Sequence, residues 1–385
     1  MNSYPVHPRS KYRAKVYGIV SAHLNNTECV KILRAENVTI RLMELPATEE
    51  SMKPHIYEAM RKDGCCGPAE LMKLYTYTID PNLHSVSVSL DLDTLLLKPF
   101  DTLFDTILYN HDTQEGKMAR ERLISEGYIA PTYIHQHQDI SNETILHQTF
   151  HAFYTKEYNA AVANGWQAKR VPLQGGFFMV KPNQTIFDEL IQIVNDGDFI
   201  MGRGIDKGWK GSGYGRHIYG SMTIQGLLAY YYNEHWQTSV ELNRCRVNQK
   251  GDNPRHTTAH QKITRPTLLR PNSSLWEDTI CRDERDNCDD TQCQNWPITE
   301  TTLVHFTSCR RQFKTPRKCN VRDVSRYEYL WEYACYDMFR EWFRTRQSLE
   351  VQREMDVPLE THSSYFFNIT FGYCEGPETY VSMKW

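Results

Sequence analysis

The chain has 385 residues, 40% of them hydrophobic, and a formal net charge of -3 from 44 basic and 47 acidic side chains. This composition supplies a core and excludes a disordered chain, and the near-neutral charge gives no reason to expect nucleic acid or an anionic membrane as the main partner. No run approaches the roughly 18 to 20 apolar residues of a membrane span, so we expect no membrane contact within this chain: either the protein is cytosolic or a targeting or anchor segment lies outside the chain.

The first part of the chain predicts a strand, a helix and a second strand, over residues 15–20, 28–35 and 38–45. Alternating and β-branched residues favour the two strands, and the order is typical of the nucleotide-binding half of a doubly wound sheet. Two further helices are predicted over residues 51–62 and 68–77, the second from apolar residues at i, i+3 and i+4. The sequence therefore predicts an α/β fold.

The next predicted strand, residues 85–90, delivers two carboxylates at its C-terminal end. Serine alternates there with valine and leucine, and the run leads directly into Asp91 and Asp93. Ligands bind at this edge of an open α/β sheet, and two such aspartates can hold a hard divalent cation against a phosphate-bearing substrate. An Asp-x-Asp pattern alone is a weak signal, because both carboxylates can also cap the following turn.

An apolar strand over residues 171–182 carries Gln174 and the pair Gly175 and Gly176. Glycines that open a strand let the backbone come close to a ligand, where any Cβ would intrude. A plain β-bulge explains the two glycines about as well.

A glycine-rich segment, residues 202–215, follows. It matches no phosphate-loop or dinucleotide fingerprint. As a mobile loop near an active site it would close over a diphosphate with Arg203, Lys207 and Lys210, although a mobile surface loop is the commoner explanation. A largely buried helix is predicted over residues 221–232, with a good N-cap at its start.

Cysteines and glycosylation sequons favour an oxidising compartment. Six of the eleven cysteines fall in one late, polar stretch: Cys281, Cys288, Cys293, Cys309, Cys319 and Cys335. This pattern indicates a loop held by disulfides; structural zinc is the alternative, although no Cys-x-x-Cys pair exists. Sequons occur at Asn25, Asn37, Asn142, Asn183, Asn272 and Asn368. Both features indicate the lumen of the secretory pathway.

Three segments, in this order, resemble the glycogenin-like family of retaining nucleotide-sugar glycosyltransferases (family 8). Residues 85–105 contain an apolar strand, Asp-x-Asp, Thr, three apolar residues, Lys-Pro-Phe and Asp-x-Leu-Phe-Asp, as in the family's metal-site segment. The Gln-Gly-Gly strand is similar to the family's Asn-(Ser/Ala)-Gly strand, with Gln174 in place of Asn. A late strand ends in His-Phe at His305, which matches the histidine that completes the metal site. The helix that has Asp-Gln in many members keeps Gln225 but has Ile224 in place of Asp.

The resemblance implies a set of site residues. The metal ligands would be Asp91, Asp93 and His305. The substrate-binding residues would be Lys73, Asp91, Gly175, Gly176, Arg310 and Lys314. The residues acting on the reacting sugar would be Gln174 and Gln225. The family's Lys-Pro-Trp motif is not intact here, and Arg310 and Lys314 offer cationic charge at shifted positions.

The resemblance also implies a fold and an activity. A GT-A type doubly wound mixed sheet flanked by helices would occupy residues 12–320, and a helical, disulfide-bearing extension residues 321–385. The enzyme would transfer a hexosyl group from a nucleotide-sugar to a glycan or glycoprotein, with retention of configuration and with Mn²⁺ or Mg²⁺ as cofactor. The expected donor is a UDP-hexose, and the expected location is the secretory lumen, in particular the Golgi. The altered residue 224 and the broken Lys-Pro-Trp motif favour the alternative, a non-catalytic module of the same fold that binds a glycan or nucleotide.

Overall fold

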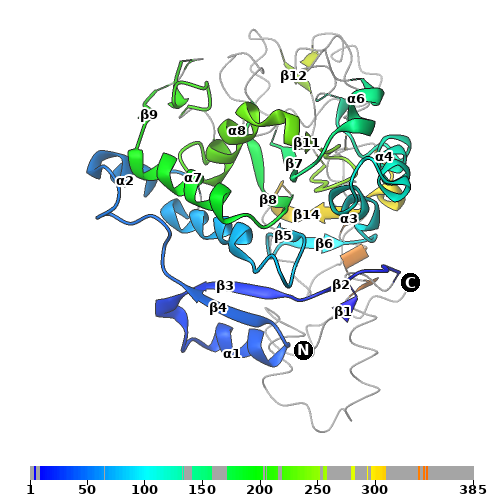
Figure 1. Cartoon of the computed structure of the whole chain (residues 1–385). Coiled ribbons are helices and arrows are strands. Elements are labelled where there is room, and N and C mark those ends of the chain that lie inside the picture. Colours follow the sequence, from blue (N-terminus) through cyan, green and yellow to red (C-terminus); the bar gives the residue numbers. More distant parts are fainter. Residues whose placement is uncertain are drawn as a thin grey trace.

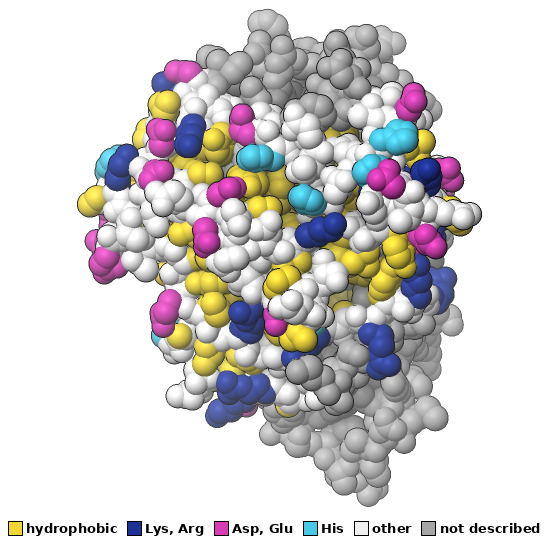
Figure 2. All heavy atoms as spheres, in the orientation of Figure 1, with side chains coloured by type: hydrophobic (Ala, Val, Ile, Leu, Met, Phe, Trp, Pro, Cys, Tyr) yellow, Lys and Arg dark blue, Asp and Glu magenta, His cyan; other side chains and the backbone are white. Residues whose placement is uncertain are grey.

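The computed structural model shows a mixed α/β fold (Figure 1), which confirms the predicted class. The structure describes residues 4–5, 9–64, 66–131, 133, 141–157, 171–202, 204, 206–215, 219–251, 255–257, 279–281, 293, 296–308, 337–338, 341–342 and 344–345. Within these residues, no helix is both long enough and apolar enough to cross a membrane. On the face shown in Figure 2, basic side chains are interspersed with acidic ones rather than gathered into one stripe.

The central element is a four-stranded mixed sheet in the order β11-β7-β8-β5. Strand β8 (Leu173–Val180) is buried along its whole length and runs antiparallel to both neighbours, β7 (Ala152–Lys156) and β5 (Ser87–Leu90). Strand β11 (Ser239–Glu241) pairs with β7 in parallel. The continuous apolar run that predicted β8 is therefore that of a central strand covered on both faces.

Two hydrophobic clusters cover the two faces of this sheet. Phe177 and Met179 of β8 pack with α3 (Asp101–Leu108), α4 (Gln114–Ser125) and α6 (Asn142–His147). Phe178 and Val180 pack on the other face with α7 (Gln184–Asp196), α8 (Ile224–Glu234), α2 (Pro54–Met60) and η2 (Gly67–Thr78). The two helical groups lie on opposite sides of the sheet in Figure 1. Successive side chains of a strand point to opposite faces, so these four residues divide between the two clusters.

The predicted strand-helix-strand unit is present at the start of the chain. Strands β3 (Tyr17–Ser21) and β4 (Thr39–Met43) pair in parallel, and α1 (Glu28–Ala35) connects them. Within the described residues the two strands form a sheet of their own, apart from the four-stranded sheet.

Strand β6 (Thr94–Leu96) pairs antiparallel with β14 (Leu303–His305), and this pairing joins two distant parts of the chain. The register places His305 opposite Thr94. The shorter elements are β1 (Tyr4–Pro5), β2 (Arg13–Ala14), β9 (Phe199–Ile200), β10 (Gly208–Trp209), β12 (Arg255–Thr257), β13 (Thr279–Cys281), η1 (Ala22–Leu24), η3 (Trp236–Thr238), η8 (Ile298–Glu300) and η9 (Phe306–Ser308).

Two predicted helices differ from the observed ones. The helix expected over residues 68–77 is the 3₁₀ helix η2. Helix α8 begins at Ile224 with Thr223 at its N-cap, three residues later than expected. Ser221 lies before the helix because its backbone oxygen accepts a hydrogen bond of 3.1 Å from the indole N–H of buried Trp209.

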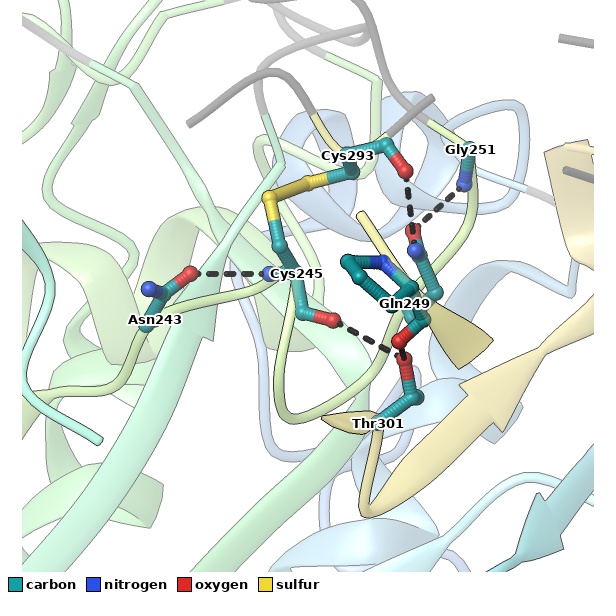
Figure 3. The surroundings of a disulfide bond; sticks show 7 residues. Asn243, Cys245, Gln249, Gly251, Cys293 and Thr301 are labelled. Carbon is teal, nitrogen blue, oxygen red and sulfur yellow. Dashed lines mark hydrogen bonds between the residues drawn. A yellow bond between two sulfur atoms is a disulfide. The ribbon is translucent and has the colours of Figure 1, made fainter. Parts of the chain in front are cut away.

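A disulfide joins Cys245 to Cys293, and both residues are fully buried (Figure 3). The expected disulfide is thus confirmed, but Cys245 lies outside the group of six late cysteines. The side chains of the other five lie outside the described residues. Most of residues 321–385 lies outside them too, so the division of the chain at 320/321 stays a prediction.

We expect the double variant Cys245→Ala/Cys293→Ala to lower the free energy of unfolding by about 2 to 4 kcal/mol. The bridge spans 48 residues of sequence, and its loss gives the unfolded chain more conformational freedom. Urea denaturation followed by tryptophan fluorescence measures the change. The control Cys29→Ala, at an exposed free cysteine, should change stability by less than about 0.5 kcal/mol. A double variant as stable as its parent would contradict the expectation.

Candidate metal and donor site

Asp91, Asp93 and His305 meet at the C-terminal end of β5. Their ligand atoms all lie within 4.8 Å of one another. Nε2 of His305 is 3.1 Å from Oδ1 of Asp93 and 3.8 Å from Oδ2 of Asp91. The pairing of β6 with β14 produces this arrangement, and the backbone N–H of Phe306 extends it by donating to the Asp93 carbonyl at 2.9 Å. The structure therefore brings together the three residues that the sequence resemblance implied.

The residues of this group fit a divalent cation. The His305 side chain is 1% exposed, and its Nε2 is a buried atom that makes no hydrogen bond within the described part of the chain. Both carboxylates beside it are partly exposed, so an ion can reach them from solvent. A buried imidazole nitrogen that faces two carboxylates is a mixed N/O donor set, which suits a manganese-like ion.

Gly176 of β8 is required by the position of His305. A Cβ at Gly176 would lie 2.2 Å from Cε1 and 2.7 Å from Nδ1 of His305, and 2.9 Å from Oδ2 of Asp91. The backbone carbonyl of Gly176 also accepts a hydrogen bond of 3.0 Å from the Asp91 N–H. The glycine thus leaves room for the side chain of His305. The sequence pattern explained this glycine by the close approach of a ligand or by a β-bulge, and it did not predict this contact.

Lys73 of η2 reaches the same group. Its Nζ lies 2.6 Å from Oδ1 of Asp91 and donates a hydrogen bond of 3.0 Å to the Gly175 carbonyl. The Lys73 side chain is about three-quarters buried and that of Asp91 more than two-thirds buried, so water screens the pair only in part. Among the residues that the structure describes, this ammonium group forms the ion pair with Asp91.

The two glutamines expected to act on a sugar bond to the protein. Oε1 of Gln174 accepts from the Gly176 N–H and from Nδ2 of Asn248. Oε1 of Gln225 accepts from the Gly175 N–H at 3.2 Å, and its Nε2 donates to the Tyr219 carbonyl at 2.7 Å. Both glutamines are more than nine-tenths buried, and the structure uses them to hold the glycine pair. Their contact with a sugar stays a prediction.

The glycine-rich segment is anchored to the core. Gly208 and Trp209 form β10, which pairs with β9, and the Trp209 side chain is fully buried. Lys207 forms an ion pair of 2.9 Å with Asp206. Arg203, Arg310 and Lys314, the other cations expected near a diphosphate, lie outside the described residues.

Sequence reasoning assigned no role to Asn248, which the structure places behind the metal group. Its Oδ1 lies 2.9 Å from Nδ1 of His305. The segment around it has no apolar periodicity that could have indicated a contact with a residue 57 positions away.

Comparison with known proteins adds a distant similarity. No protein-family model matches the chain, and no curated protein sequence matches it. Among solved structures, the chain is similar to mouse xyloside xylosyltransferase 1 in its apo form, with 12% sequence identity, coverage of 76% of this chain and 84% of that chain, and a TM-score of 0.33. A TM-score this low does not establish a shared fold, so the chemistry of the site rests on its own residues.

We expect Gly176→Ala to weaken Mn²⁺ binding by about tenfold or more, because the new methyl group displaces the His305 ring from the two carboxylates. Isothermal titration calorimetry measures the affinity. Gly175→Ala is the contrast, since its Cβ would meet Cγ2 of Ile224 at 2.9 Å and would not meet His305. Equal affinities of Gly176→Ala and the parent would contradict the proposed role of this glycine.

The variant Lys73→Gln should bind Mn²⁺ more tightly than the parent when no donor is present, on the order of tenfold. The ammonium group and the ion compete for Asp91, and removal of the ammonium leaves that carboxylate uncompensated. Lys31→Gln, in an exposed ion pair on α1, is the control and should change nothing. Weaker binding by Lys73→Gln would mean that Lys73 organises Asp91 for the ion instead of competing with it.

Proposed function

We propose that this chain is a divalent-metal-dependent glycosyltransferase of GT-A type that transfers a hexosyl group from a nucleotide-sugar with retention of configuration. The observation that carries the proposal is the buried Nε2 of His305, which faces Asp91 and Asp93 at the C-terminal end of β5. The donor would be a UDP-hexose, the acceptor a glycan or glycoprotein, and the ion Mn²⁺ or Mg²⁺. The segments that resemble the glycogenin-like family occur in the same order as in that family, which supports the proposed activity.

Each part of the site has a role in this proposal. Asp91, Asp93 and His305 would hold the ion, which when bound neutralises charge on the departing diphosphate. Lys73 lies at the same carboxylate and would donate to a phosphate or sugar oxygen of the donor. Gln225 and Gln174 fix the backbone of the glycine pair that lines the site. No side-chain base is needed if the leaving phosphate oxygen takes the acceptor proton.

A disulfide and an exposed sequon support a lumenal location in this proposal. The buried Cys245–Cys293 bridge is typical of proteins made in an oxidising compartment, and we place the protein in the secretory lumen and there in the Golgi. Asn37 is exposed, as an attached glycan requires, whereas Asn25 is partly buried. Asn183 is a poor acceptor, because its side chain caps α7 by accepting from the N–H groups of Thr185 and Ile186.

One observation favours a non-catalytic binding module of the same fold. Many members of the glycogenin-like family have an aspartate at the position of Ile224. The Ile224 side chain is fully buried in the core, where it would contact a Cβ at residue 175. No acidic group can therefore reach a sugar from this position. A module that binds a glycan or nucleotide is thus the second candidate.

A panel of nucleotide-sugars incubated with the protein and Mn²⁺ separates the two candidates. We expect release of nucleoside diphosphate from one donor, its loss with EDTA and its recovery when Mn²⁺ is restored. Binding of a donor, seen as a thermal shift, without any turnover in the presence of acceptor glycans would favour the binding module.

Asp93→Asn and His305→Ala should each weaken Mn²⁺-dependent donor binding and leave the thermal unfolding transition cooperative. Both residues would ligate one ion, so the double variant should lose much less than the sum of the single losses. Titration of donor at saturating and at limiting Mn²⁺ measures this coupling. Strictly additive losses would show that His305 is an ordinary core histidine.

A further inference from the structure

We infer that Asn248 is a positioning residue that keeps the imidazole proton of His305 on Nδ1 and so leaves Nε2 able to bind the ion. The inference rests on the proposed metal site at Asp91, Asp93 and His305. It concerns a residue that lies behind the site, and its evidence is a chain of hydrogen bonds that begins at a backbone amide.

The first step fixes the side-chain amide of Gln174. The backbone N–H of Gly176 is a donor, so the atom of Gln174 that faces it must be the acceptor Oε1. This backbone group cannot reverse its role, and it therefore sets which end of the Gln174 amide points toward Asn248.

The second step fixes the side-chain amide of Asn248. Oε1 of Gln174 only accepts hydrogen bonds, so the atom of Asn248 that lies 2.9 Å from it is the donor Nδ2. The second proton of Nδ2 points to Oγ1 of Thr155 at 2.8 Å. With Nδ2 fully used, Oδ1 of Asn248 is left to face His305.

The third step fixes the proton of His305. Oδ1 of Asn248 is an acceptor, so Nδ1 of His305, 2.9 Å away, must carry the hydrogen. A neutral imidazole has one N–H, so in the neutral ring, the form that binds a metal, the lone pair is on Nε2, 3.1 Å from Oδ1 of Asp93. The ring is thus set in the tautomer that binds a metal, by groups that are all at least 95% buried.

The backbone around Asn248 supports this reading. Its φ is 68°, in the left-handed region, where asparagine is tolerated far better than most residues. The backbone carbonyl of the next residue, Gln249, accepts from the backbone N–H of His305 at 2.8 Å. The side chain of Gln249 donates through Nε2 to the Cys293 carbonyl at 2.9 Å (Figure 3). The Cys245–Cys293 disulfide closes the same loop. Thr155 and Gln174 therefore hold the side chain of Asn248 beside His305, and the Gln249 contacts and the disulfide hold its backbone there.

Nitrogen-15 spectra of the histidine rings at pH 8, recorded without metal, test the inference. The parent should show His305 with a proton on Nδ1 only, a signal assigned by its loss in His305→Gln. Asn248→Gly keeps the backbone conformation but removes the acceptor, so it should give a mixture of tautomers and a 10- to 100-fold higher Mn²⁺ dissociation constant. Asn248→Asp keeps an acceptor facing Nδ1 and tolerance of a positive φ, but it replaces the Nδ2 donor by a carboxylate oxygen facing Oε1 of Gln174. It should therefore keep the Nδ1–H tautomer, which Asn248→Gly loses, and lower the thermal stability.

Asn37→Gly is the matched control, because Asn37 is an exposed asparagine with φ of 59° after α1, in a different part of the fold. It should leave the His305 signal and the Mn²⁺ affinity unchanged. An Nε2–H tautomer in the parent, or unaltered tautomer and affinity in Asn248→Gly, would overturn the inference. A parent whose tautomer depends on Asn248 but which binds no Mn²⁺ would support the role of Asn248 and overturn the proposed function instead.

Discussion

The pairing of β6 with β14 is the constraint on which the site depends. It carries the carboxylates that follow β5 and the histidine at the end of β14 to one place, although more than two hundred residues separate them in the chain. The histidine ring at the end of this pairing fits beside β8 because β8 has glycine where the ring lies. A side chain there would force the histidine away from both carboxylates.

The buried polar groups behind His305 fix the orientation of its ring, as the strand pairing fixes its position. A polar group inside a core is costly unless its hydrogen bonds are satisfied, and a satisfied network admits few arrangements. Thr155, Gln174 and Asn248 satisfy one another and the histidine, so the orientation of the ring is decided by the protein before any ligand arrives. The disulfide and the Gln249 contacts hold the loop that carries Asn248 in the same way.

The sequence predicted the elements whose signals are local. The strand before Asp91, the buried strand β8 and the strand-helix-strand unit at the start all show their periodicity within a few residues. The features that the sequence did not predict depend on contacts between residues that are far apart in the chain. The start of α8 is set by Trp209, the bridge to Cys293 comes from a cysteine outside the obvious group, and the reason for Gly176 is a histidine from the far end of the chain. No pattern within a short window contains such information.

The ion pair between Lys73 and Asp91 has a consequence for the sequence of events at the site. The Lys73 ammonium group already neutralises part of the charge of Asp91, so a divalent cation that binds Asp91 would take the place of that ammonium group. The displaced ammonium group would then be able to bind a phosphate of the donor. In the proposed function this exchange favours an order in which the ion binds first and the anionic donor second.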